Sequence, residues 1–185
     1  MNDYSIALFA HIVGTLGFFV ALGVEWLSLR RLRNATNTEQ VHEWLRIGAG
    51  ARRWGGVAMA IIVVAGFYMM AIAHIGAAWL MVALASIILL MVLAMGLTGR
   101  RLAAIQRTVS AASEPVSPTL HHLLHDSLLW FSMQTRVGIA LGIVFLMTVK
   151  PDLVGSLLTI GIATLLGLAY AASSADTRKA SRVIG

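Results

Sequence analysis

Histidines are the residues of this sequence with the greatest capacity for chemistry. There are six of them and no cysteine, so thiol catalysis, disulfides and cysteine-ligated metal centres are excluded. His11 lies within a long apolar stretch, and His74 lies at the end of another. An ionisable side chain inside an apolar span is costly, so it is expected to face the protein interior and to serve a function. His11 is therefore the first candidate.

Methionines extend this candidate site. They occur near the same expected depth as the two histidines, at Met69, Met70, Met81 and Met147. Imidazole and thioether groups together suit Cu(I) or the axial positions of haem. We expect His11 to hold a cofactor with His74 or Met70, and Met81 and Met147 are weaker metal candidates. The alternatives are a His11 hydrogen-bonded to a neighbouring helix, a solvated His74, and methionines that fill gaps in packing.

A second polar cluster lies between apolar stretches. His121 and His125 are one helical turn apart, which is the spacing of helical metal sites, and His122 and Asp126 adjoin them. Upstream, the segment Glu39-x-x-His42 has the spacing of carboxylate di-metal bundles. Both segments are expected near water, where nothing requires a ligand. We favour solvated side chains and keep His121 and His125 as weak metal candidates.

Membrane-spanning helices must position these residues. Five apolar stretches are long enough, because a span needs about 20 residues for a hydrocarbon core of ~30 Å. They cover residues 4–29, 54–75, 77–97, 128–149 and 153–172. The composition, 58% hydrophobic and 12% charged, is far from that of a soluble protein. Lipid offers no partner for backbone groups, and the alternating polarity of barrel strands is missing, so an all-α integral membrane bundle of five transmembrane helices is predicted.

The positive charges predict the orientation. With the N-terminus outside, thirteen of the fourteen lysines and arginines lie in the inner segments, and the outer side keeps only Lys150. This bias predicts an N-out, C-in, multi-pass protein of the inner (cytoplasmic) membrane of a bacterium, with the lipid bilayer as its partner. The net charge of +6 is thus a topology signal, and no nucleic acid is expected. Glu25 is expected to pair with Arg52 or Arg53 near the inner boundary.

The polar segments predict the helix ends. Thr36 with Glu39, or Asn37 with Gln40, is expected to open a short surface helix that Gly48 and Gly50 end. The third span continues beyond Gly99 through Arg107, and the loop of residues 110–118 breaks it. Ser117 caps a helix that starts at Pro118 and runs through the histidines into the fourth span, and Asp152 suits the start of the fifth. We expect one bundle over residues 1–172 and a polar, basic tail over residues 173–185.

Small residues recur every four positions in the fifth span. They are Gly155, Thr159, Ala163, Gly167 and Ala171, and the fourth span adds Gly138-x-x-x-Gly142. Helices in lipid associate by close backbone approach, which small residues allow. The favoured interpretation is packing of the fourth span against the fifth within one chain. A homodimer through Gly155, Thr159, Ala163 and Gly167 is the alternative.

Three short segments resemble a known family. These are Ala10-His11-Ile12-Val13, the stretch from Gly66 to Trp79-Leu80, and Phe145-Leu146-Met147-Thr148-Val149-Lys150-Pro151. They are similar to segments of the small membrane family that includes HemJ-type protoporphyrinogen oxidases, CopD-like copper-resistance proteins and related bacterial membrane proteins. The resemblance implies a four-helix core that binds haem or copper near the first-helix histidine. The HemJ-type enzymes have a lysine where this chain has Ala83, and they lack a fifth span.

These observations predict a membrane-embedded protein that binds a cofactor, b-type haem or alternatively copper, and that has a redox role. One rival is a small transporter or metal-uptake protein in which His11, the methionines and Glu25 line a path. Another is a cofactor-free partner subunit that docks through the fifth span. Whether the protein is an enzyme is left open, and the glycines form neither a Walker nor a dinucleotide-binding loop.

The predicted orientation can be tested with introduced cysteines, since the native chain has none. Cysteines at Asn2 and Asp152 should react with a membrane-impermeant maleimide on intact cells, and those at Asn34, Ser113 and Ser181 should not. Labelling at Ser113 from outside would reverse the orientation.

Overall fold

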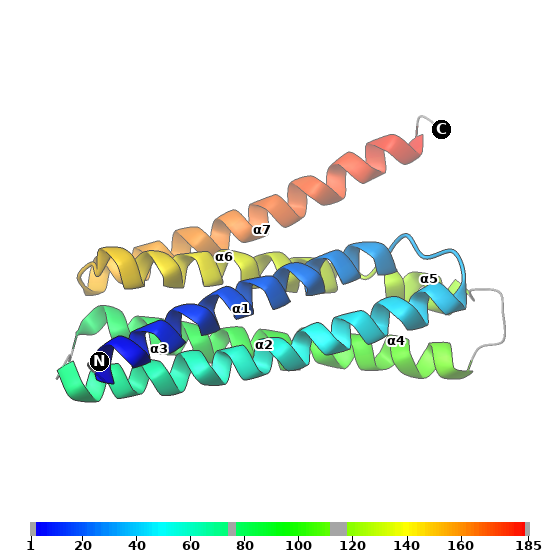
Figure 1. The fold of residues 1–185 in the computed structure, drawn as a ribbon. Coiled ribbons are helices and arrows are strands. Elements are labelled where there is room, and N and C mark those ends of the chain that lie inside the picture. The colour runs from blue at the N-terminus through cyan, green and yellow to red at the C-terminus, as the bar shows by residue number, and fades with distance from the viewer. Residues whose placement is uncertain (1–2, 74–76, 112–117, 184–185) are drawn as a thin grey trace. The chain divides into compact units, whose positions relative to one another are not determined.

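The computed structural model describes residues 3–73, 77–111 and 118–183. All regular structure in these residues is helical (Figure 1). Five helices are long and apolar enough to cross a membrane, and they include residues 3–32, 38–72, 78–110, 120–149 and 153–174. The predicted all-α class is thus confirmed, and the described residues contain the predicted five helices that could span a membrane.

The chain divides into two compact units, and each is described by itself. The first unit holds helices α1 (Asp3–Leu32) and α2 (Thr38–Ala73). The second holds α3 (Ala78–Val92), the π-helix η1 (Leu93–Gly99), α4 (Arg100–Ala111), α5 (Pro118–Leu124), α6 (Ser127–Val149) and α7 (Leu153–Val183). The predicted boundary between bundle and tail at residue 172 stays a prediction, and α7 is helical on both sides of it.

Helices α1 and α2 run antiparallel, and small residues bring them close together. A Cβ atom on Gly14 would lie 3.2 Å from the carbonyl oxygen of Ala58, and one on Gly55 would lie 3.4 Å from the Cβ of Ala21. Small residues at such points allow the close backbone approach by which helices associate in lipid.

Gly48 and Gly50 do not end a helix, which corrects the prediction. Helix α2 runs through both without a break. At Gly48 a Cβ atom would lie 2.8 Å from the Oγ of Ser28, so the glycine makes room for a polar contact with α1. The start of α2 uses the second of the two predicted residue pairs, Asn37 with Gln40. The Gln40 N–H donates to Asn37 Oδ1 over 2.8 Å, and the Thr36 N–H donates to Gln40 Oε1.

The third span continues beyond Gly99 as predicted, through α4 to Ala111. Its middle is the seven-residue π-helix η1, which was not predicted. Two of its residues, Gly96 and Gly99, have low α-helix propensity. The expected loop at residues 110–118 lies mostly outside the described residues, but Ser110 is still helical.

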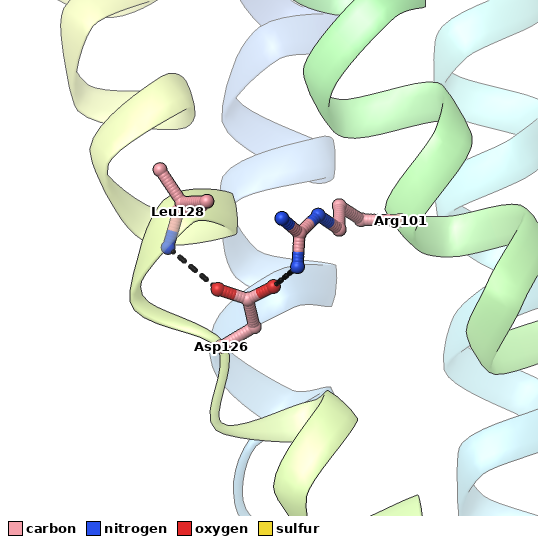
Figure 2. Close-up of polar contacts among 3 residues, drawn as sticks. All are labelled: Arg101, Asp126 and Leu128. Carbon is pink, nitrogen blue, oxygen red and sulfur yellow. Dashed lines mark hydrogen bonds and ion pairs between the residues drawn. The ribbon is translucent and has the colours of Figure 1, made fainter.

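The helix that begins at Pro118 does so as predicted, and its expected cap Ser117 lies outside the described residues. It does not continue into the fourth span, which corrects the prediction. Helix α5 ends at Leu124, and Asp126 caps α6 by accepting the Leu128 N–H over 2.9 Å. The other carboxylate oxygen of Asp126 pairs with Arg101 of α4 (Figure 2). An aspartate at this position stabilises the start of a new helix, because its carboxylate accepts a backbone N–H that has no partner within the helix.

Helices α6 and α7 are joined by a tight connection. Lys150 ends α6 in the left-handed conformation, with φ 53°. The Gly155 N–H donates to Asp152 Oδ1 over 2.8 Å, so Asp152 caps α7 as expected.

The small-residue stripe of α7 packs against α6 within the chain, as the favoured interpretation predicts. A Cβ atom on Gly138 would lie 2.3 Å from the carbonyl oxygen of Ala163, and one on Gly167 would lie 2.6 Å from that of Gln134. Two other members of the stripe are joined to each other by a hydrogen bond within α7, in which Thr159 Oγ1 donates to the Gly155 carbonyl. The homodimer stays a prediction.

The α6–α7 contact generates a prediction with a matched control. Gly167→Ala would place a methyl group against α6 backbone and should lower the free energy of unfolding by about 1–3 kcal/mol. Gly161→Ala, in the same helix, meets no atom within 4 Å and should be neutral or stabilising by up to about 1 kcal/mol. Thermal unfolding in detergent measures both. Equal effects of the two changes would contradict a close contact at Gly167.

Candidate functional site

His11 lies on α1 and reaches the backbone of α2. Its Nδ1 is 2.9 Å from the carbonyl oxygen of Ile62. A carbonyl oxygen only accepts hydrogen bonds, so Nδ1 must carry the proton and donate it. In the neutral imidazole this assignment leaves Nε2 with an unshared electron pair. The contact between helices thus fixes both the tautomer and the orientation of the ring.

Two neighbours help to hold the ring in place. Gly66 lies one turn beyond Ile62, and a Cβ atom there would come within 3.4 Å of His11 Cε1 and 3.5 Å of His11 Nδ1. The hydroxyl of Thr15 donates to the His11 carbonyl over 2.8 Å and so bonds within α1. The half-buried ring therefore lies over a position without a side chain, where a Cβ atom would make ordinary contact and only a side chain larger than that of alanine would crowd the ring.

The other predicted ligands lie in different surroundings. Met70 is half-buried on α2, one turn beyond Gly66, so it belongs to the same unit as His11. His74 lies outside the described residues. In the second unit, Met81 is 68% exposed, whereas Met147 packs against a buried cluster of Val82, Ala83 and Leu146.

A groove beside the α1–α2 contact is a separate feature of the first unit. It has a volume of about 570 Å³ and an almost wholly apolar lining, which His11 does not join. The lining residues are Asp3, Ile6, Ala7, Ala10, Ala60, Ile61, Val64, Ala65 and Tyr68. The groove therefore adds no ligand to the His11 site.

His121 of α5 and His125, which directly follows that helix, stack on each other. The ring centroids of His121 and His125 are 4.2 Å apart with an interplanar angle of 21°, and His125 Nδ1 donates to the His121 carbonyl over 3.0 Å. Asp126, beside them, is held by Arg101 and by the start of α6. Within the described ranges no group of three or more His, Cys, Asp or Glu side chains is placed to hold a metal ion. The His121 and His125 metal site stays a weak prediction.

Glu25 is buried, with 4% of its surface exposed. Neither Glu25 nor Arg52 is without a partner, and Arg53 is exposed. The predicted pairing of Glu25 with an arginine of α2 stays a prediction.

A buried polar chain in the second unit was missed by the sequence analysis. Arg136 of α6 is 3% exposed and donates to Thr98 Oγ1 over 3.4 Å, and Thr98, fully buried in η1, is 3.0 Å from Ser132 Oγ. Ser132 in turn donates to the Leu93 carbonyl over 3.4 Å. Each hydroxyl can therefore accept one hydrogen bond and donate the next, so the chain leads from the guanidinium to the first residue of the π-helix.

Arg136 had been counted with the charges that flank the spans. It lies nine residues after the first residue of α6, which is about 13.5 Å along the helix axis. That distance could have identified Arg136 as a buried residue from the sequence, because a charge that flanks a span should lie within its first turns. The guanidinium is always charged, so its burial must be balanced by hydrogen bonds of this kind.

Gln134 is a second buried polar group of α6. Its side chain is 4% exposed, and its Nε2 has no hydrogen-bond partner among the described residues. A buried amide donor in this state is a place where a water molecule or a ligand oxygen would bind.

Comparison of the chain with protein-family models, with curated proteins and with solved structures finds no match. The family resemblance of the short segments around His11, Trp79 and Lys150 therefore stays a prediction, and so does the cofactor that it implies.

The polar chain through Thr98 predicts an effect on stability. Thr98→Val removes the hydroxyl that links Arg136 to Ser132 and should lower the free energy of unfolding by about 1–3 kcal/mol, because it leaves buried donors without an acceptor. Thr108→Val, which loses only a bond to the Ala104 carbonyl within α4, is the control and should cost less. Denaturation of the purified variants in detergent gives both values.

The chain also predicts coupling between its members. Ser132→Ala combined with Thr98→Val should be less destabilising than the sum of the two single changes, by about 0.5–3 kcal/mol. Additive effects would show that the two hydroxyls act independently.

Proposed function

We propose that this protein is a membrane-embedded haem protein with a redox role, and that His11 is one axial ligand of a b-type haem. The observation that carries the proposal is the hydrogen bond from His11 Nδ1 to the Ile62 carbonyl. It leaves Nε2 as the nitrogen with a free electron pair, and that is the atom an iron would take.

The same arrangement is typical of histidines that bind metals. A ligating histidine almost always donates its other ring N–H to a carbonyl, a carboxylate or water, which orients the ring and raises its basicity. Here the acceptor is a main-chain carbonyl of a neighbouring membrane helix, so the orientation depends on the contact between the two helices. The fixed ring supports a ligand role for His11.

The second axial position has two candidates on α2 or directly after it. Met70 lies one turn beyond Gly66, and His74 follows one turn later in the sequence. Histidine and methionine are both common axial ligands, and the choice between them shifts the haem reduction potential. Bound haem would supply one-electron transfer, while the residues of α1 and α2 hold it and exclude water.

Copper is the alternative occupant, since imidazole with thioether also suits Cu(I). In that case the protein is a metal carrier or transporter, with His11 and the methionines as ligands. The five apolar helices support residence in a membrane, and the assignment to the bacterial inner membrane, N-out and C-in, belongs to this proposal.

Absorbance of the purified protein tests the proposal. Protein expressed with sufficient haem should show an intense band in the violet. His11→Ala should abolish the band, and added imidazole should restore part of it by entering the space left by the side chain. His121→Ala combined with His125→Ala is the matched control, and it should leave the spectrum unchanged.

The ligand pair can be assigned in the same experiment. Met70→Leu or His74→Ala should shift the band or the reduction potential, according to which of the two is the second ligand. The haem assignment would be refuted if the wild-type protein stayed colourless on haem titration and the His11→Ala variant, still folded, had the same spectrum. Metal analysis of that sample would then measure copper.

A further inference from the structure

The arginines of this protein fall into two groups. Several are held within the fold: the Arg30 guanidinium lies 5.5 Å from the Trp26 ring centroid, and Arg31 lies 5.8 Å from that of Trp44. Arg101 pairs with Asp126. These side chains have partners inside their own unit.

Four other arginines are exposed and have no such partner. Within the part of the chain that the structure describes, no ion pair, hydrogen bond or aromatic contact involves Arg46, Arg53, Arg100 or Arg107. They form two pairs with the same geometry, one on α2 and one on α4. Each pair is separated by seven residues, or two turns, which is about 10.5 Å along one helix face.

The surroundings of the two pairs differ in charge. Helix α4 has no acidic residue, and its exposed side carries Arg100, Arg107 and the small or neutral residues Ala103, Gln106 and Ser110. Its opposite side is buried through Leu102, Ile105 and Val109. On α2, by contrast, the exposed acids Glu39 and Glu43 precede Arg46. All the charges that α4 itself carries are therefore positive, and the Asp126 carboxylate beside it is taken up by Arg101.

The ion pair of Arg101 sets the direction in which this positive face points. Arg101 is held at the start of α6 by the carboxylate of Asp126 (Figure 2). Arg100 is the next residue back along the chain, about 100° around the helix, and Arg107 lies on the same side as Arg100. The pair is thus kept on the open side of α4.

The position of α4 along the third span indicates the partner. Helix α4 directly continues a span whose last exposed apolar side chains are Met95 and Leu97, at 74% and 40%. Arg100 follows Leu97 by about 4.5 Å along the axis, within the layer of lipid headgroups beside the hydrocarbon core. Arg107 follows Leu97 by about 15 Å, and its long side chain leans back toward that layer because side chains on a helix tilt toward the N-terminus. Guanidinium groups bind phosphate oxygens with paired hydrogen bonds. Basic residues directly outside a span are attracted to anionic lipids.

We propose that Arg100 and Arg107 form a binding site for the phosphate groups of anionic phospholipids. This site is independent of the haem proposal, because it uses another unit and other residues. The bound lipid would hold α4 in place next to the lipid headgroups and so stabilise the second unit.

The test compares the full-length protein in neutral detergent with and without added lipid. Phosphatidylglycerol should raise the thermal unfolding midpoint, and phosphatidylcholine should raise it much less. Arg100→Gln combined with Arg107→Gln should remove at least half of the phosphatidylglycerol effect. Arg46→Gln is the control, because this exposed arginine follows Glu43 and lies seven residues before Arg53, after which the second apolar stretch begins, and it should retain most of the effect.

Three further measurements make the outcome decisive. Arg100→Lys combined with Arg107→Lys keeps the charge but loses the paired hydrogen bonds, so it should retain part of the effect. Inorganic phosphate alone should give no stabilisation, and stabilisation by it would replace the lipid with a free anion. A loss in Arg46→Gln as large as the loss in the Arg100→Gln and Arg107→Gln double variant, or equal responses to the two lipids, would overturn a site on α4. Native mass spectrometry, counting retained phosphatidylglycerol, gives the same comparison without relying on unfolding.

Discussion

The structure depends on how its helices satisfy polar groups where lipid cannot do so. Between α1 and α2 the same solution is used twice. His11 donates to the Ile62 carbonyl, and Ser28 donates to the Trp44 carbonyl. In both cases the residue four positions beyond the accepting carbonyl is a glycine, Gly66 or Gly48: a Cβ atom would clash with Ser28 Oγ at Gly48, whereas at Gly66 it would only touch the His11 ring. A net value of about 0.5–1.5 kcal/mol per hydrogen bond is comparable with the cost of a glycine in a helix, about 1 kcal/mol. The glycines are therefore compatible with an unbroken helix.

This arrangement explains which parts of the fold could be read from the sequence. The spans and the α6–α7 contact depend on apolar length and on small residues at a spacing of four, and both are visible in one sequence. Whether Gly48 ends a helix or receives a side chain from another helix depends on Ser28, twenty residues away. The break before α6 depends on Asp126 having both Arg101 and a backbone N–H as partners. Local patterns contain neither piece of information.

The candidate site was predictable to a similar degree. His11 stood out because it is ionisable and lies in an apolar stretch, but its partner is a main-chain carbonyl, and every residue has one. Its tautomer could not be inferred before that acceptor was known. Arg136 was assigned to the membrane boundary because positive charges usually lie there, whereas its hydroxyl partners come from η1 and from α6 itself. The π-helix has no sequence signature beyond two glycines, so Thr98 was not expected to face α6.

The arginines of this protein have different partners according to their surroundings. Inside α6 the charge of Arg136 is surrounded by protein and begins a chain of hydroxyl groups. At the start of α6, Arg101 has a carboxylate partner and connects two helices of one unit. On the exposed side of α4, Arg100 and Arg107 have no hydrogen-bond or ion-pair partner among the described residues, so water or lipid phosphate is left to surround them. The guanidinium cannot lose its charge, so each arginine needs surroundings that stabilise a cation. These are hydroxyl groups in the first case, a carboxylate in the second, and water or lipid phosphate in the third.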